Sequence, residues 1–336
     1  MAPIHQARRS LGGKARLSAS LALLLAGWLS APLAGAQTAF VSSEKDDSLT
    51  LIDLKTQAVT GTLPTCKRPR HVQRSADGKQ LLVACGDAGA ADVIDLATRK
   101  SVGRLPIGDD PEAFDLSPDG KMLYISEEDD AALGFFDIAA KKFVRHVEVG
   151  KEPEGVKVAP DGKTVWVTSE VANMVHVIDT ASGKVLKNVK VGKRPRRFAL
   201  TPDGSQLWVT NEMSASVTVL STKDWSVLGT LNFEVKGVRA NEITPVGITM
   251  SRDGKRAFVA LGRANRVAFV DVAARKVSDL VLVGKRAWNV TLNKDETLLL
   301  AVNGLSDDVT LIDVAGAKPL KSIPVGRVPY GAVIVE

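Results

Sequence analysis

The sequence predicts an all-β fold built from seven copies of a four-stranded unit, and three markers with a common period carry this prediction. An Asp-Gly pair recurs every 42 residues, and so do an aspartate that closes an apolar strand and a proline. In each series one interval is 50 residues long, so the three markers share a single insertion of eight residues. A shared period indicates a repeat architecture rather than two unrelated domains.

The strand-closing residues set the number of units at seven. They are Asp53, Asp95, Asp137, Asp179, Ser221, Asp271 and Asp313. The Asp-Gly pairs begin at Asp77, Asp119, Asp161, Asp203 and Asp253, and Asp295-Glu296 is a degenerate sixth copy. The prolines are Pro69, Pro111, Pro153, Pro195, Pro245 and Pro329, with Ala287 in the place of one copy.

Each unit reads as four short strands joined by tight turns. In the fourth unit the apolar strands are 155–159, 164–168, 175–179 and 185–191. Asp-Gly, Asn and Ser-Gly separate them, and these residue types favour tight β-turns. Repeated four-stranded units of this length are typical of a β-propeller. The recurrent aspartates therefore have a structural role, and we expect none of them to be catalytic.

The two ends of the repeat predict how the ring closes. The first unit begins at Ala39 with its second strand, whereas residues 329–335 form an innermost strand with nothing after it. We expect this last strand to complete the first blade, which removes the exposed sheet edges that promote aggregation. The predicted seven-bladed propeller covers residues 37–336, and we expect it to be a monomer.

Residues 1–36 have the pattern of a secretory signal peptide. Four Lys and Arg residues precede an apolar run over 17–33, and the small residues at 34–36 match a cleavage site. The strongly apolar core is short for a membrane anchor, and Arg8-Arg9 leaves a twin-arginine export signal as an alternative to the general route. We predict cleavage after Ala36 and a periplasmic location.

The signal segment carries much of the excess positive charge. The whole chain has 44 Lys and Arg against 38 Asp and Glu, a formal net charge of +6. Four of the basic residues and none of the acidic ones lie in 1–36, which leaves a net charge of +2 after cleavage. Nucleic-acid binding needs a basic surface and is therefore not expected. No other apolar stretch is long enough for membrane insertion.

Cys66 and Cys85 are the only two cysteines. An exported protein meets oxidising conditions, which favours a disulfide between them over two buried thiols. Both fall on the face that we call the top, which carries the connections into the innermost strands and the turns after each second strand. No C-x-x-C or C-x-x-C-H motif occurs, so thioredoxin-like chemistry and covalently attached haem are not expected.

The residues that follow the proline markers enter the central channel and form the main candidate site. They include charges of both signs, two aromatic residues and one histidine. The candidate ligand-binding or partner-binding residues are Arg70, His71, Glu112, Glu154, Arg196, Arg197, Trp288, Asn289 and Tyr330. Such a mouth suits a polar or anionic small molecule. The alternative is a solvated funnel in which Arg and Glu neutralise each other.

The eight-residue insertion lies within 232–244 and also crosses the top face. A long loop beside a channel mouth is a candidate lid or docking element. Glu234 and Arg239 are its candidate contact residues.

Acidic residues recur on the same face. The run 127–130 offers oxygen ligands for a hard cation, but consecutive side chains point apart, so we expect a solvated loop and no metal. Glu44, Glu170 and Glu212 occupy the place of Glu128 in their own blades and suggest a partial ring of carboxylates.

The repeat resembles YVTN-type, WD40-like propeller repeats in its Val-Gly-Lys-Glu-Pro segment at 149–153 and its Ala-Pro-Asp-Gly-Lys turn at 159–163. More narrowly, residues 37–336 resemble the PQQ-dependent catabolism-associated β-propeller proteins. The segments that carry this resemblance are 233–239, which lies in the insertion, 245–248, 260–267 and 322–327.

This resemblance implies a periplasmic protein associated with pyrroloquinoline quinone-dependent alcohol oxidation, without established catalytic residues. Our leading expectation is a non-enzymatic accessory protein that binds a partner or a small ligand through the top face and has no cofactor of its own. The implied partners are a quinoprotein dehydrogenase, a cytochrome c or an ABC-type system.

Two other functions remain open from the sequence. Arg70, His71, Glu112 and Glu154 supply the residue types of a lactonase that acts on an aldonolactone, although no G-x-S-x-G, H-E-x-x-H, P-loop or Rossmann motif occurs. The channel is also a candidate site for haem or quinone.

Overall fold

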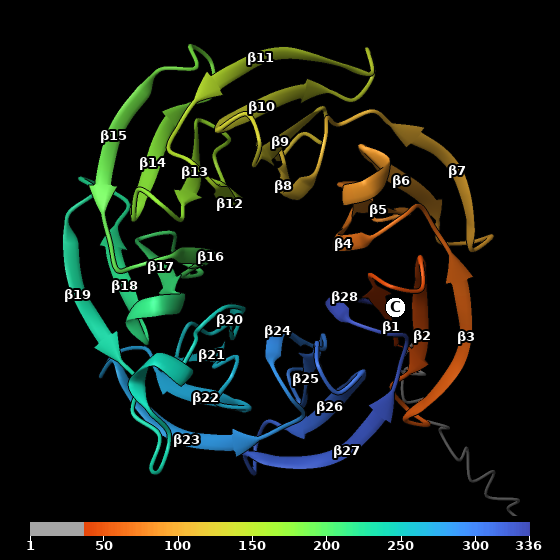
Figure 1. Ribbon diagram of the computed structural model, residues 1–336, viewed down its shortest axis with the longest axis vertical. Helices are drawn as coiled ribbons and strands as arrows, with labels where there is room; N and C mark the ends of the chain where they lie inside the picture. Colours follow the sequence, from red (N-terminus) through yellow and green to blue (C-terminus); the bar gives the residue numbers. More distant parts are fainter. Residues whose placement is uncertain (1–36) are drawn as a thin grey trace, which may run out of the picture. The chain divides into compact units, whose positions relative to one another are not determined.

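The computed structural model describes residues 37–336, and the predicted signal segment lies outside them. These residues form seven four-stranded antiparallel sheets set radially around a central axis (Figure 1). The only helical elements described are three 3₁₀ turns, η1 (Gly86–Ala88), η2 (Glu212–Ser214) and η3 (Ala240–Glu242). None of the described helices is long or apolar enough to cross a membrane. The predicted seven-bladed all-β propeller is therefore confirmed.

The strands of each blade are given from the channel outward. Blade one holds β28 (Pro329–Val335), β1 (Thr38–Ser43), β2 (Ser48–Asp53) and β3 (Ala58–Pro64). Blade two holds β4 (Pro69–Arg74), β5 (Gln80–Cys85), β6 (Ala90–Asp95) and β7 (Lys100–Leu105). Blade three holds β8 (Pro111–Leu116), β9 (Met122–Glu127), β10 (Ala132–Asp137) and β11 (Lys142–Glu148).

The remaining four blades repeat this order. Blade four holds β12 (Pro153–Val158), β13 (Thr164–Ser169), β14 (Met174–Asp179) and β15 (Val185–Lys190). Blade five holds β16 (Pro195–Leu200), β17 (Gln206–Asn211), β18 (Ser216–Ser221) and β19 (Val227–Asn232). Blade six holds β20 (Ile248–Met250), β21 (Arg256–Ala260), β22 (Arg266–Asp271) and β23 (Lys276–Leu282). Blade seven holds β24 (Ala287–Leu292), β25 (Leu298–Asn303), β26 (Asp308–Asp313) and β27 (Lys318–Pro324).

The recurrent aspartates stabilise turns, as the sequence predicts. Asp77 Oδ1 accepts hydrogen bonds from the Ser75 hydroxyl at 2.6 Å and from the Lys79 backbone N–H at 3.0 Å. Gly78 follows with φ +70°, a conformation that glycine adopts at little cost. The strand-closing Asp53 accepts the Thr56 backbone N–H at 2.7 Å. Both kinds of aspartate are therefore part of the scaffold.

The C-terminal strand closes the ring in the predicted way. β28 pairs with β1 from Thr38↔Val335 to Ser43↔Pro329. It lies innermost in blade one and also packs against β4 and β24 of the two flanking blades. The first and last described segments of the chain are thus held in one sheet.

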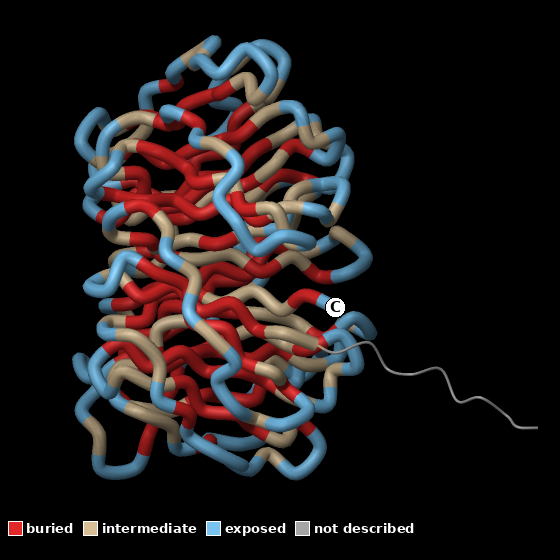
Figure 2. The backbone as a smooth tube through the Cα atoms, turned by 90° about the vertical axis from the view of Figure 1, so that its right-hand side faces the viewer, coloured by how far each residue is buried: buried red, intermediate tan, exposed pale blue. Residues whose placement is uncertain are grey.

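The hydrophobic core lies between the blades rather than at the centre of the ring. Figure 2 shows buried segments running through the strands, with exposed loops at both faces. The layer between blades one and two, for example, contains Phe40, Leu49, Leu81 and Val83. Because the sheets bury both faces against their neighbours, the top ends of the innermost strands are left free to carry polar side chains into the channel.

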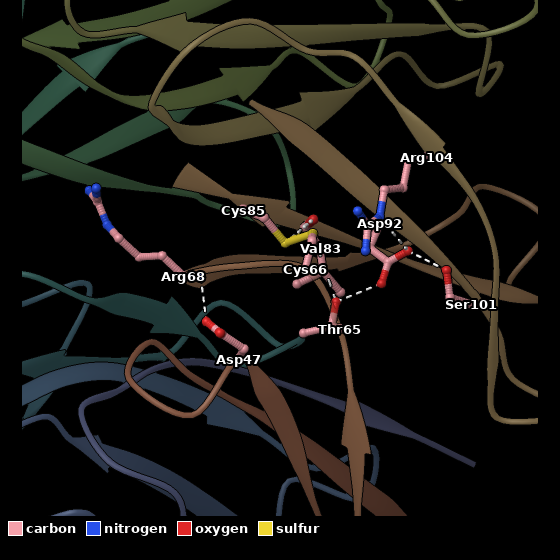
Figure 3. Close-up of a disulfide and its surroundings, with 9 residues drawn as sticks. All are labelled: Asp47, Thr65, Cys66, Arg68, Val83, Cys85, Asp92, Ser101 and Arg104. Carbon is pink, nitrogen blue, oxygen red and sulfur yellow. Dashed lines mark hydrogen bonds and ion pairs between the residues drawn. A yellow bond between two sulfur atoms is a disulfide. The ribbon is translucent and has the colours of Figure 1, made fainter. Parts of the chain in front are cut away.

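The predicted disulfide joins Cys66, which precedes β4, to Cys85 at the end of β5 (Figure 3). The two Cα atoms are 5.7 Å apart, and both residues are buried. The neighbouring Thr65 hydroxyl donates to the buried carboxylate of Asp92 at 2.7 Å, which fixes the segment that enters blade two. The disulfide ties the top-face loop beside Arg68 to the blade.

Reduction of this disulfide is expected to lower the free energy of unfolding by about 3 kcal/mol, because it closes a loop of about 20 residues. Urea unfolding of the full chain with and without a phosphine reductant measures the difference. The Cys66→Ala/Cys85→Ala variant is the control, since its unfolding midpoint should not respond to reductant. Equal midpoints for the oxidised and reduced wild type would contradict the prediction.

Candidate functional site

The seven innermost strands bring the predicted mouth residues together at the top of the channel. Arg70, Glu112, Glu154, Arg196 and Tyr330 each directly follow the proline that begins their strand. They contact one another around the ring, and Trp288 joins them from β24. Val246 of blade six occupies the seventh place and is buried.

Ion pairs between neighbouring blades hold the mouth together. Arg70 pairs with Glu112, and the Arg196 guanidinium lies 3.1 Å from both Glu154 Oε2 and Glu212 Oε2. Glu112, Glu154 and Arg196 are buried. Buried charges of this kind require partners, because an unpaired charge in the interior is strongly destabilising. In this layer of the mouth, Arg and Glu therefore neutralise each other, as in the alternative that the sequence left open.

Glu154 contacts two arginines and a tyrosine in this layer. It lies 2.8 Å from Arg197 Nη2 and accepts a hydrogen bond from the Tyr330 hydroxyl at 3.3 Å. Burial alone would raise the pKa of Glu154, but Arg196, Arg197 and Arg70 together lower it to about 2. Glu154 is therefore ionised at neutral pH and is a poor proton acceptor.

An aromatic corner forms one wall of the mouth. The Trp288 and Tyr330 rings lie 5.6 Å apart between centroids. The Arg70 guanidinium lies 4.7 Å from the Tyr330 ring centre, and the Arg286 guanidinium lies 4.8 Å from that of Trp288. Trp288 Nε1 is buried and has no hydrogen-bond partner among the described residues. The corner thus combines stacking surfaces with an unused hydrogen-bond donor.

A cavity of about 160 Å³ opens at this corner, and we call it the upper cavity. It is lined by Glu44, Arg70, Arg286, Trp288, Gly304, Leu305, Val328, Pro329 and Tyr330. Burial is the main cause that raises the pKa of Glu44, despite the nearby arginines. The shortest distance from Glu44 to these arginines is 3.8 Å, between Glu44 Oε1 and Arg70 Nε. The upper cavity therefore holds one carboxylate with an increased proton affinity, two guanidinium groups and two aromatic rings.

A second cavity of about 200 Å³ lies deeper along the channel, and we call it the lower cavity. Its polar lining residues are His71, Gln73, Asp115, Lys157, Arg197 and Asn289. Burial and the charge of Arg197 lower the pKa of His71 to about 4, so its imidazole is neutral at neutral pH. Arg197 also hydrogen-bonds the Tyr330 hydroxyl of the upper cavity. Of the predicted residues, Arg70, Trp288 and Tyr330 thus line the upper cavity, and His71, Arg197 and Asn289 line the lower one. Glu112, Glu154 and Arg196 line neither cavity.

The insertion does not lie over the mouth, which corrects the expectation of a lid. Phe233, Val235 and Ile243 pack into the core between blades five and six, and Figure 1 shows the segment with η3 near β19 and β23 at the outside of the ring. Glu234 and Arg239 are exposed there, and neither lines the upper or the lower cavity. The apolar residues of the insertion anchor it to the rim.

Sequence reasoning missed the arginines that precede the repeat prolines. Arg68 and Arg194 precede Pro69 and Pro195, and Arg286 precedes Ala287 at the same place. All three have φ between 55° and 59° in the left-handed region, and their guanidinium groups pair with mouth carboxylates. The repeat itself could have revealed these arginines, because they occupy the same position, one residue before the proline marker, in three of the repeats.

The other two described histidines belong to the scaffold. His176 contacts the Ser169 hydroxyl at 2.9 Å and Asn188 Oδ1 at 2.7 Å, in the order of a Ser-His-Asn triad. Ser169, however, is fully buried and donates to the Gly150 carbonyl at 3.0 Å. His146 pairs with buried Glu127 at 2.8 Å in blade three. Neither histidine lines the upper or the lower cavity.

Two family models match parts of the chain. The model described as "YNCE-like beta-propeller" matches residues 94–159, and the model described as "Lactonase, 7-bladed beta-propeller" matches residues 183–320. Both agree with the observed fold and with the coarser resemblance to propeller repeats. No curated protein matches the chain.

Solved structures share the fold at low sequence identity. The periplasmic gluconolactonase of Pseudomonas aeruginosa is 18% identical with a TM-score of 0.76, and the match covers 89% of this chain and 99% of that one. A putative 6-phosphogluconolactonase from Bacteroides uniformis is 15% identical with a TM-score of 0.73, again over 89% and 99%. A chain of the Kuenenia stuttgartiensis hydrazine synthase is 24% identical with a TM-score of 0.75, over 83% and 92%.

These findings correct the leading functional expectation from the sequence. The expectation of a non-enzymatic accessory of PQQ-dependent oxidation is wrong, because the matching models are a lactonase and a YNCE-like propeller and neither concerns PQQ-dependent catabolism. The match of residues 183–320 to the lactonase model favours the lactonase alternative. The periplasmic location, the absence of a cofactor and the implied partners stay predictions.

Proposed function

We propose that this chain is a lactonase that hydrolyses an aldonolactone, a cyclic sugar ester, in the upper cavity. The observation that carries the proposal is the set of groups in that one cavity: the Glu44 carboxylate, the Arg70 and Arg286 guanidinium groups, and the Trp288 and Tyr330 rings. The match of residues 183–320 to the lactonase model supports the same reaction class. We also propose that the enzyme acts in the periplasm after cleavage behind Ala36.

Glu44 is the proposed general base. Its pKa is raised by burial, and a carboxylate with an increased pKa accepts a proton from water more readily while still being ionised near neutral pH. The water that loses this proton attacks the lactone carbonyl carbon. The bond between that carbon and the ring oxygen then breaks, and Glu44 returns the proton to the ring oxygen, which gives the open aldonic acid.

The two arginines and the aromatic corner supply the remaining interactions. Negative charge develops on the carbonyl oxygen during attack, and the guanidinium groups of Arg70 and Arg286 stabilise it at the wall of the cavity. Glu112 positions Arg70 through their ion pair. The faces of Trp288 and Tyr330 accommodate the apolar face of a sugar ring, and Trp288 Nε1 is a free donor for one of its hydroxyl groups.

The decisive experiment compares Glu44→Gln with the wild-type full chain on D-glucono-1,5-lactone. Acid release in a pH-stat, corrected for spontaneous hydrolysis, is expected to fall about 10²-fold to 10⁴-fold in kcat, the usual contribution of a general base. In the wild type, kcat/KM is expected to decrease as the pH falls. Its midpoint should lie above the 4.5 of an ordinary glutamate, because a raised pKa leaves Glu44 protonated at a higher pH.

Two further variants separate the upper cavity from the lower one. Glu152→Gln removes an exposed top-face carboxylate that lines neither cavity and should leave turnover unchanged. His71→Gln should retain most activity if the reaction takes place beside Glu44. Loss of turnover in His71→Gln but not in Glu44→Gln would move the reaction to the lower cavity, and no turnover of any aldonolactone by the wild type would refute the proposed function.

A further inference from the structure

Three carboxylates from separate parts of blade three converge at the top of the channel. Asp110 precedes β8, Glu112 is the second residue of β8, and Glu128 follows β9. The antiparallel pairing Pro111↔Glu127 brings these strand ends together. One oxygen of each carboxylate lies within 4.8 Å of the other two. The acidic run at 127–130 thus contributes one member to a cluster that the sequence did not reveal.

The arginines beside this cluster are shared among too many carboxylates to neutralise it. Arg68 lies 2.9 Å from Asp110 Oδ1 and 3.0 Å from Asp87 Oδ1, and 3.9 Å from both Glu44 Oε2 and Glu112 Oε1. Arg70 pairs with Glu112 and lies 3.8 Å from Glu44 and 4.0 Å from Asp110. Within residues 37–336, the Glu128 side chain has neither an ion pair nor a hydrogen bond. Two positive charges therefore face five carboxylates.

One buried oxygen of the cluster has no hydrogen-bond partner among the described residues. Glu112 is only 3% exposed, and its Oε1 pairs with Arg70. Its Oε2 is buried and accepts no hydrogen bond among the described residues. A buried carboxylate oxygen without a partner is costly.

We propose that Asp110, Glu112 and Glu128 bind a divalent cation of the size of Ca²⁺. Calcium takes carboxylate and water oxygens at 2.3–2.6 Å, so two oxygens on opposite sides of the ion are separated by about 4.6–5.2 Å. One oxygen of each of the three carboxylates lies within 4.8 Å of the others, so the three can share one such ion. Magnesium, at 2.0–2.1 Å in strict octahedral geometry, usually binds through one or two carboxylates and keeps several waters, so a group of three carboxylates favours calcium. The cation supplies the positive charge that the two arginines do not, and water completes its coordination.

This site adjoins the proposed reaction site through Glu112, which also pairs with Arg70. Neither Asp110 nor Glu128 lines the upper cavity, and the proposed hydrolysis assigns no step to a metal. The expected consequence of binding is a more stable top face on blade three, since a ligand that binds only the folded state raises its stability.

The test is calorimetric titration of CaCl₂ into the chelator-treated full chain, paired with thermal unfolding in Ca²⁺, Mg²⁺ and EDTA. Saturable binding near one ion per chain and a higher unfolding temperature in Ca²⁺ are expected. Glu128→Gln should weaken Ca²⁺ binding roughly tenfold or more, because it removes one of three charged ligands. It should also fold normally, because Glu128 pairs with no other group in the described structure.

Asp129→Asn is the matched control, since Asp129 is the exposed neighbour in the same loop and lies outside the cluster. It should bind Ca²⁺ as the wild type does. The proposal is overturned if the wild type shows no saturable Ca²⁺ binding, if Mg²⁺ binds more tightly, or if Glu128→Gln retains wild-type affinity. Asp110→Asn gives a second, independent measurement at the other side of the cluster and should also weaken binding.

Discussion

Deletion of residues 329–336 is expected to abolish cooperative folding of the propeller. These residues form β28, which is the innermost strand of blade one and packs against β1, β4 and β24. Without β28, strand β1 becomes an open edge, and the blades on either side lose their shared contact. A protein with a long exposed strand edge is also prone to aggregation.

The size of this effect follows from the apolar side chains of the strand. Val333 and Val335 pack into the layer between blades one and two, and Ala332 and Ile334 pack into the layer between blades seven and one. At about 1.5–3 kcal/mol for each large apolar side chain, the strand contributes on the order of 5–10 kcal/mol as an upper estimate. This is comparable with the whole stability of a typical domain, about 5–15 kcal/mol.

Thermal unfolding followed by circular dichroism measures the outcome, with native-state proteolysis as a second readout. Deletion of Glu336 alone is the control, because it removes only an exposed residue whose one ion pair, with Lys294, is at the surface and contributes little. A β28 deletion that still unfolds in one sharp transition near the wild-type temperature would contradict the ring-closure argument.

The second large effect is expected from Glu154→Gln, which should lower the free energy of unfolding by about 3–5 kcal/mol at neutral pH. The substitution removes the carboxylate that both Arg196 and Arg197 contact. Arg196 keeps Glu170 and Glu212 as partners, whereas Arg197 loses its only ion pair among the described residues. A buried charge left without its partner accounts for a loss of this size.

The pH dependence of the stability provides a second, independent test of this prediction. The pKa of Glu154 is about 2 in the folded chain, against an ordinary value of 4.5. A depressed pKa contributes stability above pH 4.5 that is lost as the pH falls toward 2. The difference in stability between the wild type and Glu154→Gln should therefore be largest at neutral pH and should narrow across this interval.

Urea unfolding at a series of pH values measures both effects. Glu152→Gln is the matched control, because Glu152 is exposed two residues away and has no ion pair in the described structure. Its stability should follow that of the wild type at every pH. A constant difference between Glu154→Gln and the wild type from pH 7 to pH 2 would show that the Glu154 charge is not the cause.

The fold could be predicted from the sequence because its determinants are local and repeated. Asp77 and Gly78 form a turn through contacts with residues two positions away. The same residue types therefore produce the same turn in each repeat. The disulfide could also be inferred, because Cys66 and Cys85 are the only cysteines and both fall on the top face.

The candidate site was only partly predictable, because its contacts join residues that are distant in sequence. Position in the repeat placed Arg70, Trp288 and Tyr330 at the channel, and the upper cavity contains all three. It did not show that His71 lies in the other cavity or that Arg197 contacts Tyr330, 133 residues away. The insertion was assigned to the mouth because its length suggested a lid, whereas Phe233 and Val235 anchor it at the rim.

The position directly after each repeat proline also bears on how such a protein diversifies. Tyr330, Arg70, Glu112, Glu154 and Arg196 occupy one equivalent backbone position in five different sheets. The turns and cores that determine the fold lie elsewhere in each repeat. These side chains can therefore be substituted one at a time, or both members of an ion pair together, without loss of the fold. Among the repeats of this chain, the mouth position varies while the turn residues recur.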